Sequence, residues 1–90
     1  MKHVLLYQPV DNVLELAPLH FEAHNAWALK FHAAGTLLMY GTFGDPATQG
    51  AMAIFTSREA ADAFVADDPF MVNGVVARHE IREWDEVLSP

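Results

Sequence analysis

Two short segments of the chain hold side chains that could move a proton. The first contains His20 and His24, one helical turn apart, and the second is the run Asp67-Asp68-Pro69-Phe70. Histidine changes charge near neutral pH and is the commonest general acid or base. A carboxylate bonded to one imidazole nitrogen fixes the tautomer and stabilises the charged ring. If the fold brings His24 and Asp68 together, the sequence predicts an acid–base pair.

Each of these residues also has a plain structural interpretation. His24 could be a histidine that is hydrogen-bonded at the edge of a helix. Asp68 precedes a proline, which biases it toward an extended backbone. It could therefore simply end a helix with its carboxylate in water, which is the commoner arrangement for a single aspartate. We expect Asp67 to be the solvated one, because two adjacent carboxylates in one small site repel each other.

A metal site is a lesser alternative. His20 and His24 stand at positions i and i+4, which places both rings on one helix face. A third ligand would have to come from Glu22 or Asp68. The sequence lacks cysteine and the glutamate of an HExxH motif, so the metal signal is weak. No glycine cluster matches a phosphate-binding loop. We therefore expect neither a metal nor a cofactor.

The composition limits the classes of partner. The 90 residues suffice for a single domain over residues 1–90, and 52% apolar residues predict a folded chain. Twelve acidic against five basic side chains give a net charge of −7, so nucleic acid and anionic membrane surfaces are not expected partners. The absence of cysteine excludes disulfides and thiolate chemistry. With no leader-like segment and no apolar run of about 20 residues, we expect a cytoplasmic protein.

The pattern along the chain predicts the order β-α-β-β-α-β. Strands are expected at 3–7, 36–40, 51–55 and 75–84, and helices at 19–34 and from the Thr56–Glu59 capping box to about 66. Residues 10–17 are interpreted as a connection, with Pro18 in the first turn of the helix and Gly35 as its C-terminal stop.

This order is the split βαβ, ferredoxin-like layout of an α+β protein. Each helix carries an apolar face at helical spacing, made of Leu19, Ala23, Trp27 and Phe31 in the first and of Ala60, Ala61, Phe64 and Val65 in the second. The last strand alternates, with Val75, Ala77, His79 and Ile81 on one face. One sheet face packs on the helices, and a second copy of the chain could cover the other.

Taken together, these segments resemble the YCII-related (YciI-like) family. The matching pieces are the strand at 4–7, the run from His24 to Leu38, Gly41, the strand at 50–55, the helix start at 57–61, Asp68-Pro69-Phe70, and a final strand closing near Glu83-Trp84. The resemblance implies a dimeric α+β barrel, in which ferredoxin-like subunits pack their sheets face to face. It also implies a cleft with a proposed catalytic histidine–aspartate pair, which falls on His24 and Asp68 here. A dehydrochlorinase-like lyase activity on hydroxylated aromatics has been associated with the family.

These observations favour an enzyme that acts on a small organic substrate. We expect His24 to move a proton in an elimination or isomerisation, with Asp68 orienting the ring. The residues expected to contact substrate are His20, Trp27, Phe31 and Phe70, although the three aromatic residues are also typical of a hydrophobic core. The alternative is a module that binds a small metabolite, or serves a larger pathway protein, without turnover. The expected partners are a small molecule and a second copy of the chain.

Overall fold

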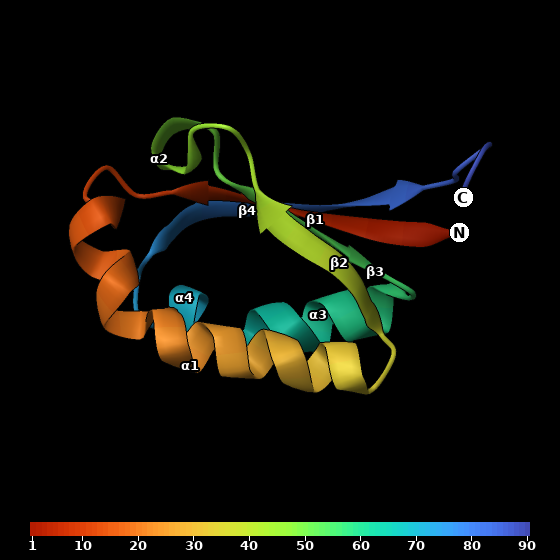
Figure 1. Ribbon diagram of the computed structural model, residues 1–90, viewed down its shortest axis with the longest axis horizontal. Coiled ribbons are helices and arrows are strands. Elements are labelled where there is room, and N and C mark those ends of the chain that lie inside the picture. The colour runs from red at the N-terminus through yellow and green to blue at the C-terminus, as the bar shows by residue number, and fades with distance from the viewer.

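The computed structural model describes residues 1–90 and shows a four-stranded sheet with α1, α3 and α4 below one of its faces (Figure 1). The strands are β1 (Lys2–Pro9), β2 (Leu37–Thr42), β3 (Ala51–Phe55) and β4 (Val76–Trp84), and the helices are α1 (Val13–Ala33), α2 (Pro46–Gln49), α3 (Arg58–Asp67) and α4 (Pro69–Val72). The strand order is β2-β3-β1-β4, and all neighbours are antiparallel. This is the ferredoxin-like α+β arrangement that the sequence predicted, with the short α2 and α4 added. No helix is long and apolar enough to span a membrane.

The first helix begins earlier than predicted. Helix α1 starts at Val13 rather than Leu19. The expected connection over residues 10–17 is therefore confined to residues 10–12, the expectation was wrong from Val13 on, and Pro18 lies inside the helix. A proline there leaves the carbonyl of Leu14 without its helical partner. Both Leu14 and Pro18 are exposed, so water can satisfy that carbonyl. Figure 1 shows the first turns of α1 running at an angle to the rest of the helix.

The C-terminus of α1 agrees with the prediction. Gly35 has a positive φ of 82° and follows the C-cap. Its N–H donates to the carbonyl of His32 at 3.0 Å, and the N–H of Thr36 donates to the carbonyl of Phe31 at 3.1 Å. These two bonds form a Schellman motif, which a residue with a side chain would strain. The chain therefore turns from α1 into β2 at the predicted residue.

The buried face of α1 differs from the predicted one. Leu19 is 72% exposed and Ala23 is also exposed, whereas His24 and Ala28 are buried. Trp27 packs against the core as expected, as does Phe31. The prediction placed the face by apolar residues alone, but a histidine whose polar atom has a partner can be buried as well.

The second long helix packs on the sheet as predicted. Phe64 of α3 is 2% exposed and lies against Phe55 of β3, with the ring centroids 5.3 Å apart. The helix is capped by Ser57, whose hydroxyl accepts from the N–H of Ala60 at 3.1 Å. The expected capping box assigned this role to Thr56, one residue too early. Glu59 consequently stands at the second helical position, outside the box.

The predicted alternation of β4 fails at its start. Ile81 pairs with Leu5 on the helix-facing side as expected, but Val76 rather than Ala77 also packs against the core. The register shifts between Gln8 and Pro9. Such a bulge inserts one residue and moves all side chains beyond it to the opposite face.

Candidate active site

Asp68 occupies the joint between α3 and α4. Its backbone is extended (φ −59°, ψ 124°), because the following proline disfavours a helical conformation and begins α4 itself. The side chain caps α4 by accepting the N–H of Phe70 at 3.1 Å. Asp68 is completely buried. A carboxylate in that position needs hydrogen-bond donors around it.

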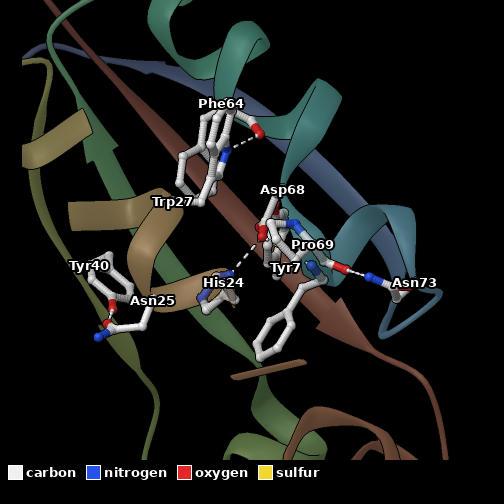
Figure 2. A network of polar contacts seen from close by, with 10 residues as sticks. Tyr7, His24, Asn25, Trp27, Tyr40, Phe64, Asp68, Pro69 and Asn73 are labelled. Atoms are coloured by element: carbon white, nitrogen blue, oxygen red, sulfur yellow. Dashed lines mark hydrogen bonds and ion pairs between the residues drawn. The ribbon is translucent and has the colours of Figure 1, made fainter. Parts of the chain in front are cut away.

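Two side chains from distant parts of the chain supply those donors. Nδ1 of His24, in α1, lies 2.7 Å from Oδ1 of Asp68, and the hydroxyl of Tyr7, in β1, donates to Oδ2 at 2.6 Å. Figure 2 shows His24 and Tyr7 converging on Asp68. The fold thus brings His24 and Asp68 together and adds a third member to the pair.

The contact with Asp68 fixes the tautomer of the neutral His24 ring. A carboxylate can only accept, so Nδ1 carries the hydrogen and Nε2 of the neutral ring carries a lone pair. Nε2 makes no hydrogen bond within the protein. It is not fully buried, so it is open to a ligand or to water. The ring is held flat against Phe70, with centroids 3.8 Å apart and planes 1° from parallel. In its neutral form, His24 therefore presents Nε2 as a basic nitrogen without a partner in the protein.

Tyr7 is a member of the site that the sequence analysis missed. Burial raises the pKa of Tyr7 far above its ordinary value of about 10, and the hydrogen bond to Asp68 and the charge of that carboxylate raise it further. Tyr7 therefore remains a donor across the physiological range. A tyrosine on the buried face of a strand usually has a partner for its hydroxyl, and this signal was available from the alternation of Leu5 and Tyr7.

His24 borders an apolar cavity of about 230 Å³. The first turns of α1 form one wall through Val13, Ala17 and Phe21, and the end of β2 forms another through Tyr40 and Thr42. The β2–β3 connection also contributes to the lining, through Pro46 and Gly50. The angle at which α1 starts allows its first turns to form this wall. The cavity contains no aspartate, glutamate, lysine or arginine among its lining residues.

The other residues predicted for the site are divided between the cavity and the core. Phe70 lines the cavity, whereas Trp27 and Phe31 do not. Trp27 packs against the core and donates its indole N–H to the carbonyl of Phe64 at 3.0 Å. His20 is half-buried one turn before His24 and does not line the cavity either.

A metal site on His20 and His24 would lack a third ligand. The structure contains no group of three or more histidine, aspartate or glutamate side chains placed to hold an ion. Nδ1 of His24 is already bonded to Asp68. His20 and His24 alone do not make a coordination site.

Fold and site together define a small ferredoxin-like α+β protein with a buried histidine–aspartate contact beside an apolar cavity. The model of the YCII-related domain matches residues 1–85, so the chain belongs to the YCII-related family, as its sequence suggested. A similar solved structure is the 5-chloro-2-hydroxyhydroquinone dehydrochlorinase from Burkholderia phenoliruptrix AC1100, in complex with 2,5-dihydroxybenzoquinone. It has a TM-score of 0.75 and 21% sequence identity, and the match covers 94% of each chain. At that identity the likeness shows a common fold. No curated protein matches the chain.

Proposed function

We propose that this protein is a small-molecule enzyme in which His24 transfers a proton and Asp68 orients the ring. The observation that carries the proposal is the 2.7 Å contact between His24 Nδ1 and the buried Asp68, with Nε2 left free beside an apolar cavity. Such an arrangement has the three parts that a general base requires, namely a basic atom, a partner that fixes its tautomer and a site that limits water.

The reaction type that we favour is elimination. Nε2 of His24 takes a proton from the substrate, the electron pair of the broken bond forms a double bond, and a leaving group departs with its own electron pair. Isomerisation needs the same base, which then returns the proton to another atom. The dehydrochlorinase of similar fold supports elimination as the first choice, although fold likeness alone does not transfer a reaction.

The test compares turnover and binding in matched variants. 5-Chloro-2-hydroxyhydroquinone is the first probe, with chloride release as the readout. We expect His24→Gln to lose about 10²–10⁴-fold in kcat, the range for general acid–base catalysis. His20→Gln is the control, since it removes an imidazole one turn away without touching the cavity, and it should retain activity. Equal activity of His24→Gln and the wild type would show that His24 is not the base.

The same variants distinguish the enzyme from a binding module. If His24→Gln still binds the probe but no longer releases chloride, the enzyme is supported. If the wild type binds the probe tightly, releases no chloride and loses that binding in His24→Gln, the cavity serves a non-catalytic binder.

We also propose that the protein is a homodimer. The sheet face opposite the helices presents exposed apolar side chains, with Met39 64% exposed on β2, Met52 37% on β3 and Trp84 45% on β4. A second copy packed on this face would bury them. Light scattering at micromolar concentration should give about twice the monomer mass, and Met52→Lys should shift the protein toward monomer. A wild-type monomer would contradict the proposal.

A further inference from the structure

We propose that Tyr7 is a positioning residue that acts through Asp68 and controls how readily His24 takes up a proton. The inference rests on the proposed function in so far as it concerns the same base. It adds a residue of β1 that sets the pH range in which this base works. The evidence is the arrangement of the groups that bond to the Asp68 carboxylate.

The two oxygens of Asp68 have different partners. Oδ1 lies 2.7 Å from Nδ1 of His24 and accepts the N–H of Phe70 at 3.1 Å. Oδ2 accepts only the hydroxyl of Tyr7, at 2.6 Å. Because Asp68 is completely buried, bulk water does not compete with these donors. Tyr7 and His24 therefore bond to opposite oxygens of one carboxylate (Figure 2).

His24 is the one of these three partners that changes charge near neutral pH. The backbone N–H of Phe70 does not ionise. Burial raises the pKa of Tyr7 and Asp68 raises it further, so the hydroxyl keeps its proton. Two donors to the carboxylate are thus fixed, while the imidazole gains and loses a proton against the same carboxylate.

The other elements packed against His24 bond no further charge to its ring. Tyr40 of β2 meets the ring edge-on, with centroids 6.0 Å apart, and its hydroxyl bonds to a neutral side chain. Helices α3 and α4 contribute the apolar rings of Phe64 and Phe70. On α1 itself, His20 lies one turn away and is half-buried. The titratable side chains around the ring are thus Asp68, Tyr7, Tyr40 and His20.

The direction of the effect follows from the competition for the carboxylate charge. A negative charge beside an imidazole favours its protonated form. The hydroxyl of Tyr7 draws part of that charge toward Oδ2, which leaves less of it at Oδ1 for His24, and such coupling is strong in a low-dielectric interior. Tyr7 therefore makes His24 harder to protonate. A larger share of the base then stays in its reactive form at neutral pH.

The first test is an NMR titration of the His24 ring in the full chain without a ligand, with His24→Gln used to assign the resonances. Tyr7→Phe removes the hydroxyl and keeps the ring that helps to line the cavity. We expect the midpoint of the His24 titration to rise by at least about half a pH unit, which is about threefold in the protonation constant. A smaller rise, no change or a fall would overturn the inference, because a purely structural Tyr7 leaves the midpoint where it is.

A stronger donor at the same position should have the opposite effect. The chain contains two tyrosines, Tyr7 and Tyr40, so 3-fluorotyrosine incorporated into Tyr40→Phe labels Tyr7 alone. Fluorine beside the hydroxyl makes the phenol more acidic and strengthens its bond to Asp68. We expect the His24 midpoint to fall relative to Tyr40→Phe with ordinary tyrosine. A midpoint that rises or stays the same would contradict the inference, even if Tyr7→Phe is too unstable to titrate.

The pH profile of chloride release separates this inference from the proposed function. If His24 is the base, the acidic limb of kcat/KM follows the titration of its ring, and in Tyr7→Phe both should move to higher pH by the same amount. A limb that stays fixed while the NMR midpoint moves would refute His24 as the base and leave the role of Tyr7 intact. A fixed midpoint in an enzyme that releases chloride would refute the role of Tyr7 alone.

Discussion

Removing the Tyr7 hydroxyl should destabilise the protein in a way that depends on pH. Oδ2 of Asp68 accepts only from Tyr7, because the other two donors bond to Oδ1. Tyr7→Phe therefore leaves one oxygen of a completely buried carboxylate without a donor. A hydrogen bond to a charged group contributes about 1.5–3 kcal/mol. We expect a loss of about 2.5 kcal/mol in the free energy of unfolding at pH 7.

The same difference should shrink at high pH. The pKa of Tyr7 is raised in the folded protein, first by burial and then by Asp68, whereas an unfolded tyrosine ionises near pH 10. The folded state therefore holds this proton more tightly. The associated stability is fully present below about pH 10 and is lost above it by about 1.4 kcal/mol per pH unit. Phenylalanine has no such proton, so the wild-type advantage should fall to about 1 kcal/mol at pH 11.

Urea unfolding of both proteins at pH 7, 9, 10, 10.5 and 11, followed by tryptophan fluorescence, measures this difference. Lysine and arginine titrations are common to the two proteins and cancel. Tyr40→Phe at pH 7 is the control, because its hydroxyl bonds to Asn25 at the exposed surface, and it should cost about 0.5 kcal/mol or less. A loss below about 1 kcal/mol in Tyr7→Phe at pH 7, or a difference that stays constant to pH 11, would refute the assigned role of Tyr7.

Three further predictions concern the scaffold and are measured by urea unfolding. Phe64→Ala should lower the free energy of unfolding by about 3–5 kcal/mol, and a change below about 1 kcal/mol would contradict the placement of α3. Gly50→Ala should cost more than about 3 kcal/mol, because φ is 81° and the new Cβ would lie 1.9 Å from the carbonyl oxygen of Tyr7. Gly74→Ala, at a φ of 71° with nothing within 4 Å, should cost only about 1 kcal/mol, and equal losses at the two glycines would show that the clash is relieved. Ser57→Ala should cost about 1 kcal/mol through the lost cap, and no change would mean that Thr56 replaces it.

The β-α-β-β-α-β order could be predicted because its signals are local. The stop at Gly35 and the start of α3 follow from the backbone freedom of glycine and from the side-chain oxygen of an N-cap residue. The start of α1 could not be found in this way. A proline inside a helix costs about 3 kcal/mol, so Pro18 was placed in the first turn, where it costs nothing. The helix tolerates Pro18 because Leu14 and Pro18 are exposed, so water can bond to the carbonyl of Leu14 that loses its helical partner.

The site was harder to predict than the fold. The contact of His24 with Asp68 links residues 44 positions apart, and that of Tyr7 with Asp68 links residues 61 apart. Both contacts depend on how α1 and α3 pack on the sheet, and no local sequence pattern determines that packing. The family resemblance pointed to His24 and Asp68 but not to Tyr7. Trp27 was expected at the site because it shares a helix with His24, yet its ring packs against the core between α1 and α3.

Asp68 joins the stability of the fold to the chemistry proposed for the site. Its backbone separates α3 from α4, and its carboxylate connects the N-terminus of α4 to β1 and α1. Desolvating a carboxylate costs several kcal/mol, and an apolar residue of similar size often serves folding as well or better. A buried carboxylate at this joint is therefore better explained by a need for charge beside His24 than by folding alone. An Asp68 variant should therefore weaken both the stability of the fold and the proposed proton transfer. His24→Gln, which leaves the α3–α4 joint intact, is the variant that separates them.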